Sequence, residues 1–166
     1  MKIKIGILGL ADIAYNRFIP SLLKSERFQL AGVAKFKGEN IDRARRFEEK
    51  YQVNVYDNFE EMIEDPSIRA VYLPLPPATH FIWAKKCLES GKHVLVEKPC
   101  TISLSDTNML IELAREKKLA IHENYMFEFH SQINQVKEWI HSRKYGDIRI
   151  IRSSFGFPLR ARNDFR

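Results

Sequence analysis

The strongest constraint on the fold of this 166-residue chain is a regular alternation of two apolar patterns over residues 2–124. Short runs rich in Ile, Val and Leu, typical of buried strands, alternate with segments whose apolar residues recur at helical spacing. The connections between them are short. Strands and helices that alternate in this way form a parallel sheet with helices on both faces. We therefore predict an α/β fold with a doubly wound parallel sheet.

The pattern predicts six strands with helices between them. The expected strands cover residues 2–8, 28–36, 53–56, 70–75, 93–96 and 119–124. The expected helices cover residues 13–23, 39–51, 59–63 and 81–88, and a further segment for which Ser103 is a suitable N-cap. These elements complete one unit, and we place a dinucleotide-binding domain at residues 1–124.

The turn after the first strand carries a phosphate-binding pattern. Gly9, Leu10, Ala11, Asp12 and Ile13 lead into the first helix, and Ala14 follows them. The segment matches GxGxxG with alanine at the second and third glycine positions. Such a turn lets a pyrophosphate approach the backbone and the free amides at the start of the helix. We predict that residues 9–13 contact a dinucleotide, and a plain strand-to-helix connection is the alternative.

A second pattern stands at the end of the fifth strand, where a buried run stops at Glu97, Lys98 and Pro99. Ligands of an open parallel sheet bind beyond the carboxyl ends of its strands. Pro99 also restricts the backbone of Lys98. We predict that Lys98 is the catalytic residue, and that Glu97, one residue earlier on the strand, points to the other face and acts in positioning. The alternative is a strand followed by a solvated turn.

The end of the second strand indicates which dinucleotide binds. An enzyme that prefers NAD usually places an acid about 20 residues beyond the glycine pattern, where it accepts a hydrogen bond from the ribose 2′-hydroxyl. Here no acid occurs before Glu39, and Lys35 and Lys37 would favour a 2′-phosphate. We predict NADP as the cofactor, with NAD possible. A basic loop that faces water is the alternative for either lysine.

Composition excludes several other classes of protein. The net charge of +6 comes mostly from basic residues that alternate with acids, as on a solvated helix. An arginine-rich end could contact a phosphate backbone, but no nucleic-acid recognition motif accompanies it, and we expect no nucleic-acid partner. The arginines concerned are Arg149, Arg152, Arg160, Arg162 and Arg166.

The chain shows neither a leader peptide nor an apolar stretch near 18 residues, so we expect a cytoplasmic protein without a membrane span. Cys87 and Cys100 do not form a disulfide framework, and we expect Cys87 in the core. The histidines lack the spacing of metal ligands, so no metal site is predicted.

Residues 125–166 do not fit the first unit. Ile133, Val136, Trp139 and Ile140 form the apolar stripe of a further helix, which we expect to be core. Residues 147–157 read as a strand of a different sheet. We predict that residues 125–166 begin a second, truncated α/β domain, and that the lone strand is either poorly ordered or paired with a neighbouring molecule.

Taken together, four segments resemble the glucose-fructose oxidoreductase, inositol dehydrogenase and MocA family. They are Ile5 to Ala14, Ala70 to Pro76 with His80, Gly91 to Pro99, and Glu123 to Phe127 with His130. Alanine at the second glycine position resembles the branch that includes dihydrodiol dehydrogenases and nucleotide-linked 3-ketosugar reductases.

The resemblance implies an N-terminal Rossmann domain and a C-terminal α/β domain that binds substrate and makes a homo-oligomer. It implies hydride transfer between the nicotinamide and a ring carbon of a sugar, with Lys98 hydrogen-bonded to the reacting oxygen. Pro74, Pro76, Glu97 and Lys98 would lie at the cofactor, and His80 would either touch it or close the loop over it.

Two departures from the family pattern limit these expectations. Glu128 and Ser131 stand where many relatives have arginine and proline, and a second catalytic tyrosine or histidine would lie beyond the position of Arg166. A catalytically silent NADP-binding sensor or partner subunit is therefore the alternative function.

Overall fold

The computed structural model of the chain describes residues 2–38, 41–154 and 156. It divides into two compact units, Met1–Tyr125 and a second unit that starts at Met126. Glu39, where the second helix was expected to start, and Phe157, Arg160, Arg162 and Arg166 lie outside the described residues.

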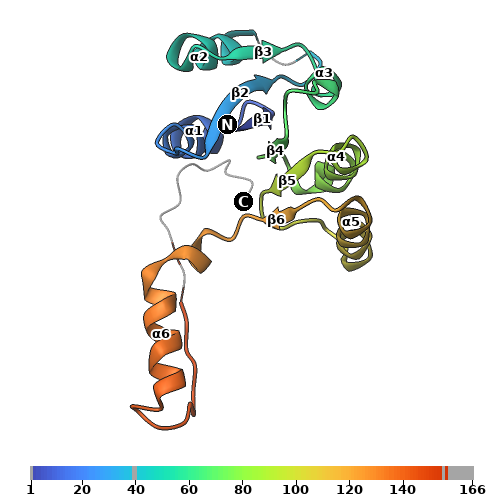
Figure 1. Cartoon of the computed structure of the whole chain (residues 1–166). Helices are drawn as coiled ribbons and strands as arrows, with labels where there is room; N and C mark the ends of the chain where they lie inside the picture. The colour runs from blue at the N-terminus through green and yellow to red at the C-terminus, as the bar shows by residue number, and fades with distance from the viewer. Residues whose placement is uncertain (1, 39–40, 155, 157–166) are drawn as a thin grey trace. The chain divides into compact units, whose positions relative to one another are not determined.

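The first unit is built on a six-stranded sheet in which every pair of neighbours is parallel. The strands are β1 (Ile3–Leu8), β2 (Phe28–Ala34), β3 (Asn54–Tyr56), β4 (Ala70–Leu73), β5 (His93–Val96) and β6 (Ile121–Glu123). Their spatial order is β3-β2-β1-β4-β5-β6 (Figure 1). The predicted doubly wound α/β fold is confirmed, because the order reverses between β1 and β4.

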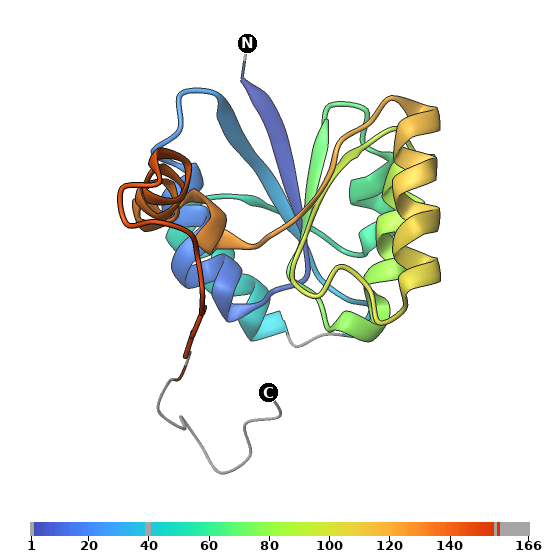
Figure 2. The same cartoon turned by 90° about the horizontal axis from the view of Figure 1, so that it is seen from below.

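Helices cover both faces of this sheet, as Figure 2 shows. One face carries a π-helical turn (Ala14–Phe18), α1 (Ile19–Leu22) and α2 (Ile41–Tyr51). The other face carries α3 (Phe59–Glu64), α4 (Pro77–Glu89) and α5 (Leu104–Lys117). Ser103 caps α5 as predicted, since its hydroxyl accepts a hydrogen bond from the Asp106 amide at 3.4 Å.

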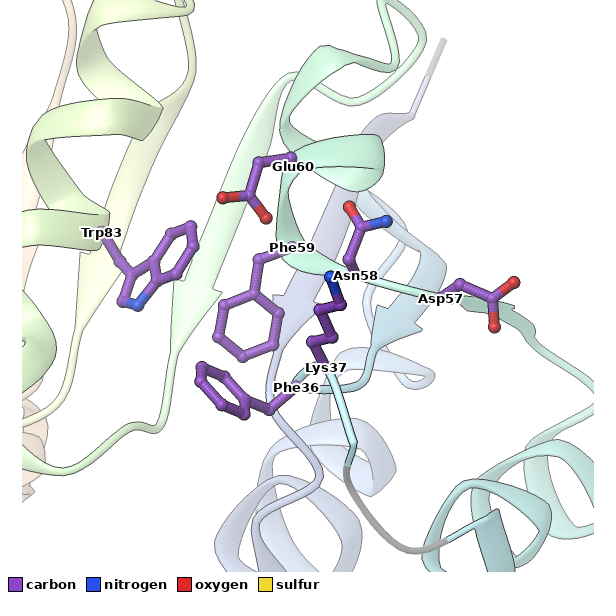
Figure 3. A pocket seen from close by; sticks show the side chains of 7 residues that line it. All are labelled: Phe36, Lys37, Asp57, Asn58, Phe59, Glu60 and Trp83. Carbon is purple, nitrogen blue, oxygen red and sulfur yellow. The ribbon is translucent and has the colours of Figure 1, made fainter.

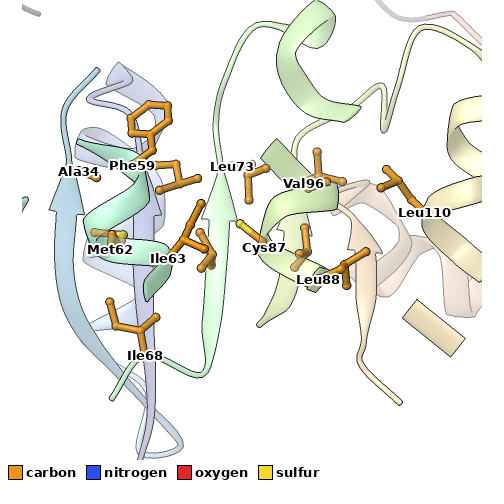
Figure 4. Packing of buried hydrophobic residues seen from close by; sticks show 14 of the residues in the cluster. Ala34, Phe59, Met62, Ile63, Ile68, Leu73, Cys87, Leu88, Val96 and Leu110 are labelled. Carbon is orange, nitrogen blue, oxygen red and sulfur yellow. The ribbon is translucent and has the colours of Figure 1, made fainter. Parts of the chain in front are cut away.

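Each face of the sheet has its own hydrophobic core. Because side chains alternate along a strand, Val71 and Leu73 of β4 pack toward α3, α4 and α5, whereas Tyr72 between them packs toward α1 and α2. Figure 4 shows the first of these cores, with Met62, Cys87 and other side chains of the helices against the strands. The sheet is therefore buried on both faces, as expected of a parallel sheet.

The second unit contains a 3-10 turn (Met126–Phe129) and α6 (Ser131–Ser142). The helix forms where its apolar stripe predicted it, but the expectation that the stripe is core is wrong. No residue of α6 is buried, and Trp139 is 45% exposed. Among residues 126–154 and 156, no other helix longer than a 3-10 turn and no strand is present to cover the stripe.

The strand predicted over residues 147–157 is also wrong for the part that the structure describes. Residues 147–154 adopt no strand. A strand needs hydrogen-bonding partners along its edge, and the described part of this unit supplies none.

Candidate functional site

The segments predicted to bind a cofactor all follow the carboxyl ends of strands. Residues 9–13 follow β1, Lys35 and Lys37 follow β2, Pro74 and Pro76 follow β4, and Glu97 and Lys98 follow β5. Because all six strands are parallel, these segments share one edge of the sheet. This edge includes the position between β1 and β4 where ligands of such folds bind.

The turn after β1 is tight because of Gly9. Its φ of +95° favours glycine, and a Cβ atom there would lie 2.8 Å from Cδ2 of Leu75. The Gly9 amide donates to the carbonyl of Ala34, which ties the turn to β2 at 2.8 Å. A side chain at position 9 would therefore require the Leu75 side chain to move and would be strained by the positive φ.

The other residues of this turn differ in what they expose. The side chain of Leu10 is buried in the core, so only its backbone is available to a ligand. Ala11 is half-buried, whereas Asp12 and Ile13 are exposed. The Asp12 carboxylate lies 4.0 Å from the Arg46 guanidinium of α2.

A cavity of about 650 Å³ opens beside the end of β2, and we call it the aromatic pocket. Its lining residues come from three segments of the chain and are Phe36, Lys37, Asp57, Asn58, Phe59, Glu60 and Trp83 (Figure 3). The ring of Phe59 meets those of Phe36 and Trp83 edge to face, with centroids 5.8 and 4.8 Å apart. The pocket combines flat apolar surfaces with charged groups.

The two acids of the aromatic pocket each have a lysine partner. The Lys35 ammonium lies 2.7 Å from the Asp57 carboxylate. The Lys86 ammonium donates to the Glu60 carboxylate at 2.9 Å, and this bond lowers the pKa of Glu60. Of the two lysines predicted to face a phosphate, Lys37 lines the pocket, whereas Lys35 is engaged with Asp57.

Sequence reasoning missed Asp57 and the three rings. Asp57 follows β3, so an acid reaches the pocket from the strand beside β2 rather than from β2 itself. The only local signal was Phe36, an aromatic residue directly beyond a strand end; the spatial meeting of Phe59 and Trp83 has no sequence signal.

At the end of β5, Glu97 belongs to a buried hydrogen-bond network. One oxygen of its carboxylate accepts from the Tyr72 hydroxyl and from the Asn124 amide, each at 2.7 Å. Desolvation, followed by the bond to Glu97, raises the pKa of Tyr72 far above its ordinary value. The Tyr72 ring also stacks on Phe18, with centroids 4.0 Å apart.

Lys98 follows Glu97 and is exposed, whereas Glu97 is only 9% exposed. The peptide bond between Lys98 and Pro99 is cis. Just beyond the end of β5, Glu97 thus points into the protein and Lys98 is exposed, at the edge where the other predicted segments lie.

His80 joins two loops at this edge. Its ring is fully buried, with Nδ1 2.8 Å from the Pro99 carbonyl and Nε2 2.7 Å from the Leu75 carbonyl. Both ring nitrogens are thus engaged with backbone, which favours the loop-closing role over direct contact with a cofactor. Nearby, Pro74 is buried and Pro76 is the exposed N-cap residue of α4.

Both cysteines are buried. Cys87 is fully buried as predicted, and desolvation raises its pKa to about 12. The Cys100 amide donates to Glu123 at 2.7 Å, and desolvation raises the pKa of the Cys100 thiol.

Among residues 2–38, 41–154 and 156 no three potential metal ligands of the His, Cys, Asp or Glu type gather at one point. No helix in the described part of the chain has the length and apolarity needed to cross a bilayer.

Comparison with known proteins identifies the family. Residues 3–125 match the model of the Gfo/Idh/MocA oxidoreductase family, in the part described as its NAD-binding Rossmann fold. The match spans most of the chain, so this chain belongs to that family, and the predicted resemblance is confirmed.

The relatives include enzymes that act on nucleotide sugars. The chain is 37% identical to dTDP-3,4-didehydro-2,6-dideoxy-alpha-D-glucose 3-reductase of Streptomyces violaceoruber, over 99% of this chain and 47% of that protein. It is 36% identical to the enzyme of the same name from Saccharopolyspora spinosa, over 99% of this chain and 48% of that protein. The chain spans about half the length of these relatives.

A solved structure agrees with the fold. The crystal structure of KijD10, a 3-ketoreductase from Actinomadura kijaniata in complex with NADP, superposes with a TM-score of 0.82. It shares 35% sequence identity, over 90% of this chain and 47% of KijD10.

Proposed function

We propose that this chain is the nucleotide-binding part of an NADP-dependent oxidoreductase that moves a hydride between the nicotinamide and a ring carbon of a sugar or nucleotide-linked sugar. Residues 1–124 form the dinucleotide-binding domain, and residues 125–166 begin the domain that binds substrate and makes the homo-oligomer. The observation that carries the proposal is the aromatic pocket, which places Lys37 beside three aromatic rings at the end of β2.

The residues present fit the adenosine end of NADP. The rings of Phe36, Phe59 and Trp83 offer apolar faces and edges against which an adenine can pack. Lys37, which Figure 3 shows reaching along the pocket beside Asn58, supplies the positive charge that a 2′-phosphate requires. β2 ends without an acid, so this strand offers no acceptor that would select a free 2′-hydroxyl.

The turn after β1 fits the pyrophosphate. Gly9 brings the backbone close to the loop after β4, and the backbone of Leu10 and the small side chain of Ala11 leave room for the diphosphate. Asp12 and Ile13 lie at the start of the following helix, where free amides favour an anion.

Lys98 is placed for the chemistry of the sugar. When NADP is bound, its nicotinamide supplies or accepts the hydride. Lys98 would hydrogen-bond the sugar oxygen and help to supply or remove its proton. Glu97, held by Tyr72 and Asn124, would fix the backbone from which Lys98 projects. His80 would join the loop that carries Pro74 and Pro76 to the segment that carries Pro99.

The relatives support this substrate class, since they include dTDP-sugar 3-reductases and a 3-ketoreductase in complex with NADP. We further propose that the protein works in the cytoplasm. Its two cysteines are buried and unpaired, as is usual in a reducing compartment.

The proposal is tested by fluorescence titration of the chain with NADPH and with NADH. We expect NADPH to bind at least about tenfold more tightly, because only NADPH carries the 2′-phosphate. Lys37→Ala should remove most of this preference, whereas Lys85→Ala, on the exposed side of α4, should leave it unchanged. Equal affinities for NADPH and NADH in the unmodified chain would refute the proposal.

A further inference from the structure

The aromatic pocket contains an acid that its proposed ligand should not tolerate. Asp57 lies at the end of β3, its side chain is 77% exposed, and it lines the cavity together with Lys37. A free carboxylate at this place would repel a 2′-phosphate and would accept a hydrogen bond from a 2′-hydroxyl. By its position, Asp57 would favour NAD.

Lys35 changes this situation. Its ammonium lies 2.7 Å from the Asp57 carboxylate, and its side chain is only 18% exposed. The Lys35 amide also donates to the Tyr56 carbonyl at 3.1 Å. The backbone of Tyr56, the residue before Asp57, is therefore bonded to the backbone of Lys35. Lys35 is therefore held on Asp57 and would have to leave it to reach a ligand.

The other charged residues of the pocket lining also favour a phosphate ligand. Glu60, the other acid, is paired with Lys86 at 2.9 Å. Lys37 forms no ion pair with another described residue, and its charge is only the smallest of the causes that lower the pKa of Glu60, after the bond to Lys86. Because both acids are paired with other lysines, Lys37 is the charged group of the lining that can bind an anion.

We propose that Lys35 determines cofactor specificity indirectly: it neutralises Asp57, so that Lys37 alone contacts the 2′-phosphate. Lys35 is then a specificity residue that acts through its neighbour, and it does not itself bind the phosphate. This inference rests on the proposed function, because it concerns the same pocket.

Charge-neutral replacement of the pair distinguishes the two roles of Lys35. The chain and its Lys35→Met, Asp57→Asn and Lys35→Met/Asp57→Asn variants are titrated calorimetrically with adenosine 2′,5′-bisphosphate and with 5′-AMP. These probes report the adenosine end alone and need neither nicotinamide nor turnover. The matched control is Lys85→Met/Glu89→Gln, which removes a lysine and an acid that lie 3.8 Å apart on α4, outside the pocket lining.

If Lys35 acts by neutralising Asp57, Lys35→Met should weaken binding of the bisphosphate about tenfold, because Asp57 is left unpaired. It should have little effect on binding of 5′-AMP. The double variant should return to within about threefold of the unmodified chain, as should the control. If Lys35 contacts the phosphate directly, the double variant will instead stay well below the unmodified chain and will bind the bisphosphate much more weakly than Asp57→Asn, which keeps the lysine, and the inference is overturned.

The double variant alone decides the matter if Lys35→Met does not fold, since it contains no unpaired charge. Unchanged bisphosphate binding by a folded Lys35→Met would also overturn the inference. Failure of the proposed function looks different: the unmodified chain would then bind the bisphosphate no more tightly than 5′-AMP.

Discussion

The two halves of the sheet handle polar groups in opposite ways. Beside β3, β2 and β1, the two acids of the aromatic pocket form ion pairs at the surface, as Asp57 does with Lys35. Beside β4, β5 and β6, polar side chains lie inside the protein and are bonded there, as Glu97 and His80 are.

This difference suggests that the half with the aromatic pocket recognises the ligand, whereas the buried polar groups of the other half stabilise the fold. A surface ion pair contributes little to folding, so the pocket can change its preference for a ligand without loss of the fold. A buried polar group costs free energy when its partner is removed. The half that holds Lys98 should therefore tolerate little change around it, whereas Lys98 itself is exposed and replaceable.

The largest effect is expected at Glu97. Glu97→Leu leaves the Tyr72 hydroxyl and the Asn124 amide without their acceptor, and we expect the free energy of unfolding to fall by about 3 kcal/mol or more. Urea denaturation measures this. The adjacent Lys98→Ala should change stability by less than about 0.5 kcal/mol. Similar losses for the two variants would contradict the contrast between the halves.

A smaller loss is expected at His80. His80→Phe fills the site but removes the ring nitrogens that contact the buried carbonyls of Leu75 and Pro99, so at least one carbonyl loses its donor, and we expect a loss of about 2 kcal/mol in the same measurement. Lys85→Ala, on the exposed side of the same helix, is the control. A stable His80→Phe variant would show that the two loops do not depend on this link.

The Tyr72 network should also make stability depend on alkaline pH. Burial raises the pKa of Tyr72 in the folded state, so above pH 10 the unfolded chain loses this proton while the folded protein keeps it. Stability must then fall as pH rises, by up to about 1.4 kcal/mol per pH unit for this group. Other groups with shifted pKa values are present in both chains and cancel when the unmodified protein is compared with Tyr72→Phe. If the curves of unfolding free energy against pH for the unmodified protein and Tyr72→Phe are parallel above pH 10, the raised pKa of Tyr72 is refuted.

The smallest effect is expected in the aromatic pocket. Replacing Lys35 and Asp57 together by Met and Asn should change the free energy of unfolding by less than about 1 kcal/mol, because Asp57 is largely exposed. Thermal and urea unfolding check this. A loss as large as that expected for Glu97→Leu would mean that the pocket, too, depends on its charges for folding.

Much of the first unit could be predicted from residues that lie close together in the sequence. The apolar run that forms β5 is followed directly by Glu97 and Lys98, and the expectation that these two residues face opposite ways agrees with a buried Glu97 and an exposed Lys98. In the same way, the position of Gly9 directly after β1 predicted a tight turn, and its φ of +95° agrees. Such features depend on backbone geometry over a few residues.

Features that depend on distant residues could not be predicted. The role of Asp57 could not be predicted, because it depends on β3 lying beside β2 in the sheet. Nor could the acceptor of the Tyr72 hydroxyl, which lies 25 residues further along the chain. The stripe of α6 was predicted as core because helical spacing alone does not say whether a second layer covers it. Local pattern was enough for the order and type of the elements, since propensity and periodicity act over one or two turns. Which charges meet, and which side chains are buried, was decided only by packing, because burial and pairing depend on what folding brings from elsewhere in the chain.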